Sequence, residues 1–483
     1  MAEFDEVYYE KLMDGLEVSE IRLSDLERTS RIDAEFYQKK NLLVKQILNK
    51  WDKSAFSECF NVSDGNHMSI SDEFCNEGVP YYRGQDIYNL FIENSSPLHI
   101  SNEAYNKPTM RRSYLKKGDV LMSIVGAIIG NSALVTSGRE ATCSCKLAIL
   151  RSYDESIMPE TMLVFIKTKY GQNQIQKFKR GAAQTGLLLE DFEQLFIPKF
   201  SKKLQYICKK YVDKIKMLMD EAVQIYSEAE QLLIETLGLQ DFNTQIERYA
   251  IKSFKTSFGD TGRLDAEFYQ CEYDNYETVL KQYRCGYALV GDICTIKDVN
   301  YNPDDKTEYQ YIELSNVGQQ GDISECDRIY GIDLPTRARR KVFTNDVIIS
   351  SVEGSLSKCA LVTDDCDGYV CTNGFYVLNS DFINAETLML LFKSEPVQAL
   401  LKKGCSGTIL SAIGKDELLK IPLPIIDIEI QNKIKSLIIE SNVARKRGKN
   451  LLNKAIELVE IAIEQGENAV LKYMHGEGIC YER

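Results

Sequence analysis

An eight-residue segment of this chain occurs twice. Residues 31–38 read RIDAEFYQ and residues 263–270 read RLDAEFYQ, so seven of the eight positions are identical at an offset of 232 residues (263 − 31). Further matches follow in the same order at offsets of 227, 223 and 224 residues: Asp119-Val120 with Asp346-Val347, Gly181 and Thr185 with Gly404 and Thr408, and Ile197-Pro198 with Ile421-Pro422. Such a drift is typical of diverged copies with different surface-loop insertions. The repeated unit is far longer than a solenoid repeat, which indicates a duplicated domain.

Each copy closes with a long segment in which apolar or small residues recur at alternating steps of four and three. This alternation is the heptad pattern of a supercoiled helix. The stripes span 204–236 and 430–462, at a constant offset of 226 residues (430 − 204). We expect two antiparallel helices in contact, each about 50 Å long at ~1.5 Å per residue. The alternative is that each stripe forms an amphipathic helix folded onto its own domain.

Small residues gather in the middle of both stripes, where they would let two helices approach closely. A glycine inside a helix costs ~1 kcal/mol relative to alanine, so a close crossing would explain Gly448. The small residues are Ala222, Ser441, Ala444 and Gly448. The predicted helix–helix contact residues are Leu218, Ala222, Ile225, Ala444, Gly448 and Leu451.

Within each copy the pattern mixes strands and helices, which indicates the α+β class. Short β-branched runs at 119–124 and 346–350 predict buried strands, and 133–135 and 360–362 continue the sheet. Residues 162–178 and 387–403 predict helices, each followed by a glycine.

The expected architecture is a pseudo-twofold dumbbell, in which two duplicated domains are separated by two long antiparallel coiled-coil helices. The predicted boundaries are a first domain at 1–200, a long helix at 201–240, a linker at 241–262, a second domain at 263–425, and a second long helix with a short tail at 426–473.

The composition predicts a soluble globular protein. The chain has 483 residues, of which 44% are hydrophobic and 27% charged. No run approaches ~18 consecutive apolar residues and the first residues lack a signal pattern, so we expect a cytoplasmic protein without a membrane partner. The 14 cysteines are expected to be reduced. With no C-x-x-C pair and only 3 scattered histidines, the sequence predicts no metal site.

Catalytic motifs are missing from the sequence. Residues 126–132 (GAIIGNS) resemble a phosphate loop but lack its lysine and spacing, so we interpret them as a turn between strands. There is no nucleophile elbow, zinc-protease motif or dinucleotide fingerprint. The Asn-Pro-Pro-Tyr/Phe motif of amino-group methyltransferases is also missing. We therefore predict a non-enzymatic chain with no cofactor of its own.

Basic residues gather at matched places in both copies, before the predicted strands and before the glycines. A net charge of −13 argues against non-specific nucleic-acid binding but says little about local patches. A solvated turn is the alternative for any single cluster, whereas duplication favours phosphate contacts. The candidate DNA-binding cations are Arg111, Arg112, Lys116, Lys117, Lys177, Lys179 and Arg180 in the first copy, and Arg337, Arg339, Arg340, Lys341, Lys402 and Lys403 in the second.

One segment of each copy combines groups that can reach base edges. In the first copy, 79–87 read VPYYRGQDI, and in the second, 309–317 read YQYIELSNV. Differing polar groups in one frame are expected of two readers of different sequences. The candidate base-contacting residues are Tyr81, Tyr82, Arg83 and Gln85, with Glu313, Ser315 and Asn316 in the second copy.

These residues resemble the DNA-specificity subunit of type I restriction-modification systems. The likeness rests on VPYYRGQDI, KKGDVLMSIVGAIIGNSALV and RGAAQTGLLLEDFEQLFIPKF in the first copy, and on TNDVIISSVEGSLSKCALV and KKGCSGTILSAIGKDELLKIPLPII in the second. It covers nearly the whole chain in the family's order of recognition domain, helix, recognition domain and helix. The resemblance implies a non-catalytic chain that binds double-stranded DNA, two methyltransferase subunits along the helices and a translocating nuclease subunit outside. Those partners would hold the S-adenosylmethionine and the ATP.

Two other functions remain open at this stage. The chain could be an interaction scaffold whose duplicated domains bind proteins, with the helices as spacer. A lone nuclease or methyltransferase is disfavoured because no catalytic set is found. A methyltransferase gene next to the gene of this chain would favour the specificity subunit.

Overall fold

The computed structural model describes residues 6–23, 26, 31–154, 156–181, 185–240, 242, 249–259, 261–407 and 411–476. Thr408, which the alignment of the copies paired with Thr185, lies outside the described residues, as do 241, 243–248 and 260 of the predicted linker. The chain forms two compact units. Unit 1 consists of Met1–Asp220 with Lys446–Arg483, and unit 2 consists of Glu221–Arg445.

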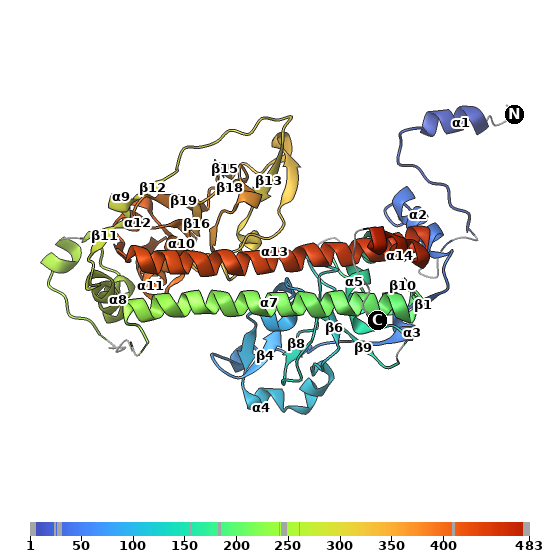
Figure 1. Cartoon of the computed structure of the whole chain (residues 1–483), viewed down its shortest axis with the longest axis horizontal. Coiled ribbons are helices and arrows are strands. Elements are labelled where there is room, and N and C mark those ends of the chain that lie inside the picture. Colours follow the sequence, from blue (N-terminus) through green and yellow to red (C-terminus); the bar gives the residue numbers. More distant parts are fainter. Residues whose placement is uncertain are drawn as a thin grey trace. The chain divides into compact units, whose positions relative to one another are not determined.

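The central sheet of unit 1 is antiparallel, with the strand order β2-β9-β6-β7. Figure 1 labels its strands β6 and β9. Strand β6 is buried on both faces: Val120 and Met122 enter the main core, whereas Leu121 enters a second core. This double burial explains why its sequence is continuously apolar rather than alternating. The bounds are β2 (Phe60–Asp64), β6 (Val120–Ser123), β7 (Ser132–Leu134) and β9 (Leu147–Ser152).

A second sheet of unit 1 has the order β3-β5-β4-β8, and strands β4 and β8 in it are parallel. A third pair joins β1 to β10. The bounds are β1 (Lys53–Ala55), β3 (Phe74–Cys75), β4 (Val79–Tyr82), β5 (Leu98–Ile100), β8 (Thr142–Cys143) and β10 (Phe196–Pro198). The shorter helices of unit 1 are α1 (Glu6–Met13), α2 (Lys39–Leu48), α3 (Phe56–Cys59), α4 (Asn102–Tyr105), α5 (Pro159–Lys167), α6 (Lys169–Phe178) and α14 (Glu467–Gly476).

Unit 2 repeats the strand order of the central sheet of unit 1, and its second sheet shares one parallel strand pair with that of unit 1. Its central sheet has the antiparallel order β12-β19-β16-β17, and Val347 and Ile349 of β16 enter one core while Ile348 enters another. A second sheet has the order β14-β13-β18-β15, and β13 and β18 are parallel, as β4 and β8 are. The bounds are β12 (Cys294–Ile296), β13 (Glu308–Ile312), β14 (Asp327–Tyr330), β15 (Ala338–Lys341), β16 (Val347–Ser350), β17 (Cys359–Leu361), β18 (Val370–Thr372) and β19 (Phe375–Ser380).

The remaining elements of unit 2 follow unit 1 in part: β11 pairs with β22 as β1 pairs with β10, whereas the pair β20-β21 has no counterpart among the named strands of unit 1. Their bounds are β11 (Tyr287–Leu289), β20 (Cys405–Ser406), β21 (Ala412–Ile413), β22 (Pro422–Pro424), α8 (Cys271–Lys281), α9 (Val290–Ile293), α10 (Ala385–Lys393), α11 (Glu395–Lys403) and α12 (Lys415–Leu419). A mixed helix-and-sheet fold is therefore what the structure shows.

The helix predicted in each domain is in fact two helices. In unit 1, Thr168 has an extended ψ of 158° between α5 and α6, and its hydroxyl accepts a hydrogen bond from the N–H of Gly171. In unit 2, Ser394 separates α10 from α11, and Pro396 lies in the first turn of α11. The apolar periodicity continues across both breaks, and for this reason it predicts one long helix in each domain. The N-cap residue Thr168 and Pro396 mark where the second helix begins.

The repeated RxDAEFYQ segment forms the same contacts in both units, and we call this arrangement the arginine clasp. In unit 1, Arg31 bonds both carboxylate oxygens of Asp33, at 2.7 and 2.8 Å, and its guanidinium lies 4.8 Å from the centre of the Phe36 ring. Its third nitrogen reaches the carbonyls of Lys177 and Phe178, 3.4 Å away at the end of α6. The last carbonyls of a helix lack partners within the helix, so the clasp satisfies them.

Arg263 repeats this geometry in unit 2. It bonds both carboxylate oxygens of Asp265, at 2.9 and 2.5 Å, and stacks 4.3 Å from the centre of the Phe268 ring. It also donates to the carbonyl of Cys405, at 3.2 Å, just beyond α11. Hydrogen bonds from the arginines lower the pKa of Asp33 and of Asp265. The arginine, aspartate and phenylalanine of the repeat are therefore structural.

The two long helices contribute to the core of each unit. Helix α7 (Lys202–Leu237) and helix α13 (Ile428–Gln465) are both divided between the units. In unit 1 they run antiparallel: the N–H of Ser201 bonds Glu467, at 2.7 Å, whereas Ile215 and Met219 lie against Gly448. Leu218 is buried, and the half-buried Leu451 packs against the same core. A Cβ added at Gly448 would lie 2.7 Å from Met219 Cε.

In unit 2 the helices meet at a buried hydrogen bond. Ser441 Oγ donates to the backbone carbonyl of Ala222, at 2.7 Å, and Ser441 is fully buried. Ala444 is buried on the same helix. The predicted heptad stripe is only partly right beyond this point of α7: its member Ala229 is buried, but Tyr226 and Leu233 are buried where Ile225 and Leu232 are only half-buried. A straight α-helix drifts from a strict heptad, and here the buried side of α7 follows the helical period into the core of unit 2.

We expect the arginine clasp to stabilise each unit. Arg31→Ala should lower the free energy of unfolding of unit 1 by about 1–3 kcal/mol, since it leaves two helix carbonyls and a carboxylate without their partner. Arg263→Ala should do the same in unit 2. Denaturant unfolding at several pH values measures this, with the exposed Arg139→Ala as a matched control. Because the folded pKa of Asp33 is lowered, its contribution is present above about pH 4 and disappears as the pH falls through the folded value. An effect of Arg31→Ala that is as large at pH 2 as at pH 7 would contradict the ion pair.

We also expect Gly448 to be required by the contact with α7. Gly448→Leu should lower the free energy of unfolding by ~1–3 kcal/mol through overpacking against Met219, and by less in a Met219→Ala background. Asn453→Leu, at an exposed position of α13, is the control. Thermal melts decide the matter: a higher Tm for Gly448→Leu would mean that the glycine is merely a poor helix former.

Candidate nucleic-acid interface

The parallel strand pair of each unit ends in a matched turn. In unit 1, β4 is followed by the short helix η3 (Gly84–Asp86), and the N–H of Arg83 donates to the carboxylate of Asp86, at 2.8 Å. In unit 2, β13 is followed by η9 (Leu314–Asn316), and the N–H of Glu313 donates to Asn316 Oδ1, at 2.8 Å. We refer to residues 83–86 and 313–316 as the matched turns. In each, a residue three positions on caps the first N–H.

Tyr81 and Tyr82 are not part of an exposed surface, which corrects their prediction as DNA contacts. Each is 5% exposed, and their side chains enter two different cores of unit 1. Burial raises the pKa of both phenols above the ordinary value. Successive side chains of a strand point to opposite faces, and both faces of β4 are covered at these positions, so neither tyrosine is exposed. The tyrosines instead support the strand from which the matched turn begins.

The first residue of each matched turn is held by a partner of opposite charge. Arg83 bonds Asp86 through Nε, at 2.9 Å, and through Nη2, at 3.1 Å, and Asp86 is 5% exposed. Glu313 accepts a hydrogen bond of 2.7 Å from Arg337. Two bonds to one carboxylate fix the plane of the Arg83 guanidinium, and a fixed guanidinium loses little entropy when it binds a further acceptor. Asn316 is engaged with the carbonyl of Glu325, at 2.8 Å, so its amide is used for folding.

The exposed residue at the tip of each matched turn is Gln85 in unit 1 and Ser315 in unit 2. An amide can bond an adenine edge with two hydrogen bonds, whereas a hydroxyl accepts or donates at any base. The two tips therefore present different hydrogen-bonding groups in the same local structure. Among the predicted base-contacting residues, these two are the most available.

The basic segment of unit 1 is attached to the same sheet as the matched turn. Arg111 and Arg112 lie in the short helix η5 (Pro108–Ser113). Ser113 and Thr142 of β8 are fully buried and share a hydrogen bond of 2.6 Å between their hydroxyls. Because β8 is the parallel neighbour of β4, η5 packs on the sheet that carries the matched turn.

Arg112 is neutralised within unit 1, which weakens its case as a phosphate contact. It forms an ion pair with Asp64, whose side chain is 10% exposed and also bonds His67 Nε2, at 2.7 Å. Neither Asp64 nor His67 was predicted. They lie 48 and 45 residues before Arg112 in the chain (112 − 64 and 112 − 67), so no local pattern connects them with it. Arg111 is exposed and has no ion-pair partner among the described residues.

A buried aspartate shapes the turn that carries Lys116 and Lys117. Asp119 is 1% exposed, accepts the N–H of Lys116, at 2.7 Å, and bonds Arg151 Nη2, at 2.6 Å. Both lysines are exposed and, in the part of the chain that the structure describes, make no ion pair. The turn precedes β6, whereas the matched turn packs against Ser123 at the other end of that strand. The lysines and Gln85 therefore lie at opposite ends of β6.

The basic segment of unit 2 has a different local structure. Arg339, Arg340 and Lys341 lie on the edge strand β15 and not in a short helix. Arg339 bonds Asn302, at 3.0 Å, Arg340 bonds Asn300, and Lys341 lies 5.0 Å from the centre of the Tyr301 ring. Arg337 is held by Glu313, as described above. The cluster matches that of unit 1 in chain position only, and its cations are engaged by a neighbouring loop.

Most of the cations before the two glycines are structural, which corrects another part of the prediction. Lys177 lies 4.1 Å from the ring centre of Phe36 in the arginine clasp, and Lys403 lies 5.2 Å from that of Phe268. Lys403 also bonds Glu277, at 3.2 Å. Arg180 forms an ion pair with Asp191, which is 2% exposed. The remaining two are the half-buried Lys179 and the exposed Lys402.

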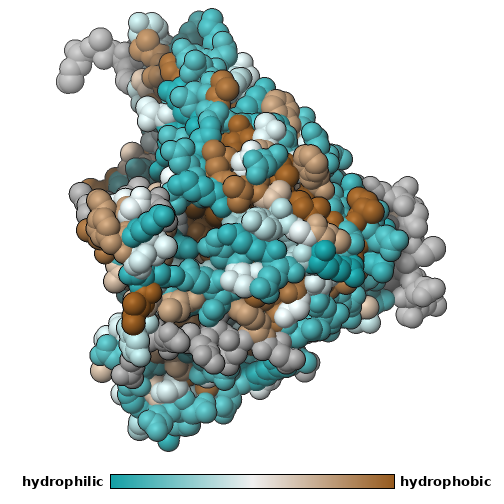
Figure 2. All heavy atoms as spheres, turned by 90° about the vertical axis from the view of Figure 1, so that its left-hand side faces the viewer, coloured by the Kyte–Doolittle hydropathy of each residue, from teal (hydrophilic) through white to brown (hydrophobic). Residues whose placement is uncertain are grey.

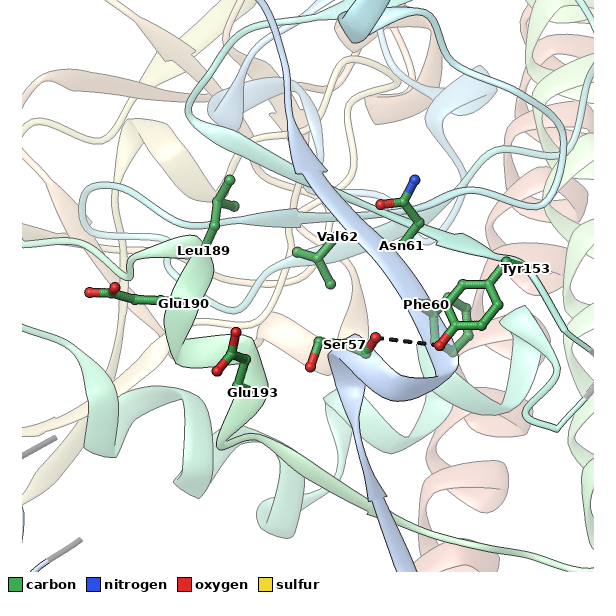
Figure 3. Close-up of a pocket in the computed structure, with 8 residues that line it drawn as sticks. All are labelled: Ser57, Phe60, Asn61, Val62, Tyr153, Leu189, Glu190 and Glu193. Carbon is green, nitrogen blue, oxygen red and sulfur yellow. Dashed lines mark hydrogen bonds between the residues drawn. The ribbon is translucent and has the colours of Figure 1, made fainter. Parts of the chain in front are cut away.

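Unit 1 also has an open pocket of about 640 Å³, shown in Figure 3. It lies beside β2, and Glu190 and Glu193 line one side while Tyr153 lines the other. Two carboxylates repel phosphate, so the pocket is not part of a nucleic-acid surface. Among the described residues no group of histidine, cysteine and carboxylate side chains is arranged to hold a metal ion. Their helices include none that is long and apolar enough to cross a membrane.

Three solved structures resemble this chain over most of its length. The S subunit of a type I restriction-modification system from M. genitalium is 12% identical, and the match covers 86% of this chain and 95% of that chain with a TM-score of 0.37. The HsdS subunit from Thermoanaerobacter tengcongensis is 14% identical, with 86% and 97% covered and a TM-score of 0.28. A chain from a structure of type I R-M system assembly is 15% identical, with 86% and 98% covered and a TM-score of 0.29.

No family model matches this chain, and no curated protein matches it. The resemblance to S subunits of type I systems, which the sequence motifs suggested, is therefore found again among solved structures. Structural similarity with TM-scores of 0.28 to 0.37 is too weak to assign a function. A function for this chain therefore has to rest on its own residues.

If unit 1 contacts phosphates, the exposed cations should contribute most. Replacing Arg111, Lys116 and Lys117 together with alanine should weaken DNA binding by the chain. It should also reduce the salt slope by about three phosphates' worth, roughly 0.9 per phosphate. Arg112→Ala should have a smaller effect because Asp64 already balances its charge. Binding titrations at several salt concentrations measure both, with the exposed Lys11, Lys40 and Lys50 replaced together by alanine as a matched loss of three charges. An unchanged slope for the triple variant would exclude this surface.

Proposed function

We propose that this chain is the DNA-specificity subunit of a type I restriction-modification complex and reads a bipartite target. Each unit takes one half-site, and the matched turn of that unit contacts base edges. The chain itself is non-catalytic. The specificity function is inferred from the sequence motifs that resemble the family, and the non-catalytic role from the lack of a catalytic motif in the sequence.

One observation carries the proposal: the two matched turns share a local structure but present different groups. Both follow the first strand of a parallel pair along the chain, and both are capped by a residue three positions on. Their exposed tips are Gln85 and Ser315, and their first residues have opposite charge. A duplicated frame with exchanged polar groups suits two readers of two different half-sites.

Two methyltransferase subunits are the proposed protein partners, bound along α7 and α13, and a translocating nuclease subunit binds outside them. The methyltransferase subunits supply S-adenosylmethionine chemistry and the nuclease subunit supplies ATP hydrolysis. The long helices act as the spacer between the half-sites. A partner with basic surfaces also accounts for the acidity of this chain, whose net charge of −13 cannot by itself hold a polyanion.

A non-catalytic protein scaffold is the second candidate, and the state of unit 2 favours it. There the cations of the basic segment are engaged within the chain, so unit 2 offers fewer free charges to a phosphate backbone than unit 1 does. The two functions differ in a simple observable, because a scaffold has no influence on which DNA sequence is methylated.

The modular reading of a bipartite target can be tested at the tips of the matched turns. Gln85→Ala should relax one half of the methylated target and leave the other half unchanged, at ~1–3 kcal/mol of discrimination per lost pair of hydrogen bonds. Ser315→Ala should affect only the opposite half. Arg83→Ala is a poorer probe, since it also disturbs the cap at Asp86. Genome-wide methylation mapping of cells that express each variant with the neighbouring methyltransferase is the measurement. Degeneracy spread over both half-sites would contradict the assignment, and methylation that ignores this chain would favour the scaffold.

A further inference from the structure

The arginine clasp accounts for only part of the identity between the two repeats. It uses the arginine, the aspartate and the phenylalanine of RxDAEFYQ for contacts inside each unit. The second position of the repeat is instead an exposed aliphatic residue: Ile32 is 82% exposed and Leu264 is 73% exposed. The alanine and glutamate that follow the aspartate are also exposed in both units. We call Ile32, Ala34 and Glu35, and their counterparts Leu264, Ala266 and Glu267, the clasp faces.

Single exposed aliphatic residues are common and carry no meaning alone. Here, however, the same kind of residue is exposed at the same position of two units, beside the same alanine and the same glutamate. Folding does not require this, since none of the clasp contacts involves these side chains. Elsewhere on the surface the units differ, as at Arg83 and Glu313. Identity on an exposed surface therefore needs a reason outside the fold.

The clasp also holds these residues in a fixed position. Arg31 ties Asp33, which lies within the face, to the end of α6, and Arg263 ties Asp265 to the carbonyl of Cys405 in unit 2. A short surface that is already ordered loses little conformational entropy on binding, so a small contact can contribute measurable affinity. Figure 2 shows that, on the face it draws, apolar residues occur in groups among hydrophilic ones.

We propose that the two clasp faces are equivalent docking points for two identical copies of one protein subunit. The matching surface of that subunit is an apolar pocket that takes Ile32 or Leu264, with a lysine or arginine at its rim facing Glu35 or Glu267. Different surfaces of the two units serve different half-sites, whereas identical surfaces serve identical partners. This inference rests on the proposed function, in which the methyltransferase is the subunit present in two copies, and it adds a contact at each clasp face to the contact along α7 and α13.

The test uses the full chain co-expressed with the methyltransferase subunit encoded beside it, with stoichiometry read by native mass spectrometry and affinity by titration. The wild-type chain should carry two methyltransferase subunits. Ile32→Asp and Leu264→Asp should each leave one tightly bound subunit and weaken the other by roughly tenfold or more. The double variant should lose both at the same concentration. Glu35→Lys and Glu267→Lys should weaken binding in the same pattern, and increasingly so at low salt.

Matched controls separate docking from general exposure and from folding. Leu23→Asp in unit 1 and Val299→Asp in unit 2 alter residues that are each 84% exposed and lie outside the clasp faces, so two subunits should remain bound. The exchanges Ile32→Leu and Leu264→Ile should also keep both. Thermal melts check that the aspartate variants fold, and Ile32→Ser and Leu264→Ser replace them if they do not.

The outcomes distinguish the two proposals. Two subunits bound with unchanged affinity in both folded single variants would overturn the docking inference and leave the specificity function intact. A wild-type chain that binds no methyltransferase would overturn the proposed function itself. Loss of both subunits in either single variant would mean that the two sites are not independent, which also contradicts two equivalent docking points.

Discussion

A buried carboxylate at the head of the central strand organises each unit. Asp119 binds Arg151, and Asp346 binds Lys297, at 2.7 Å, although both aspartates are 1% exposed. Each also accepts the N–H three residues earlier, from Lys116 or Phe343. A buried charge that loses its partner is strongly destabilising, so each pair holds a second segment in place: β9, the neighbour of β6, through Arg151, and the end of β12 through Lys297. The sheet, the turn before it and the surface of that turn all depend on the same oxygen atoms.

The sequence predicted the elements well and their partners poorly. The duplicated segments, the buried strands and the two long helices all produce periodic or repeated patterns, and such patterns are local. The sequence did not predict the partners of Lys177, Arg180 and Arg112. These partners, Phe36, Asp191 and Asp64, are too distant in the chain for a local pattern to connect them. A basic residue looks the same in the sequence whether it is solvated, neutralised or stacked on a ring. Only the packing of distant segments decides between these states.

The candidate site shows the same division. The frame of the matched turns was visible in the sequence, because β4 and β13 and the polar residues after them lie at related positions. The sequence did not show which side chains point outward, so the two tyrosines of β4 were predicted to be exposed although both are buried. Gln85 and Ser315 stand out only once the cap at Asp86 and Asn316 is seen to bend the chain. The chemistry that the turns can offer is therefore narrower than the sequence suggested.

The hydrogen bond between Ser441 and Ala222 limits which insertions and deletions the two long helices can accept during evolution. A hydroxyl buried between helices finds its acceptor in one register only, and sliding α13 along α7 by one turn would leave it unsatisfied at a cost of about 1–3 kcal/mol. The bond thus fixes the register of the two helices within unit 2. If residues were inserted into one helix on the unit 2 side of this hydrogen bond, an equal insertion would be needed in the other helix. Changes in helix length that keep the fold should therefore come in pairs.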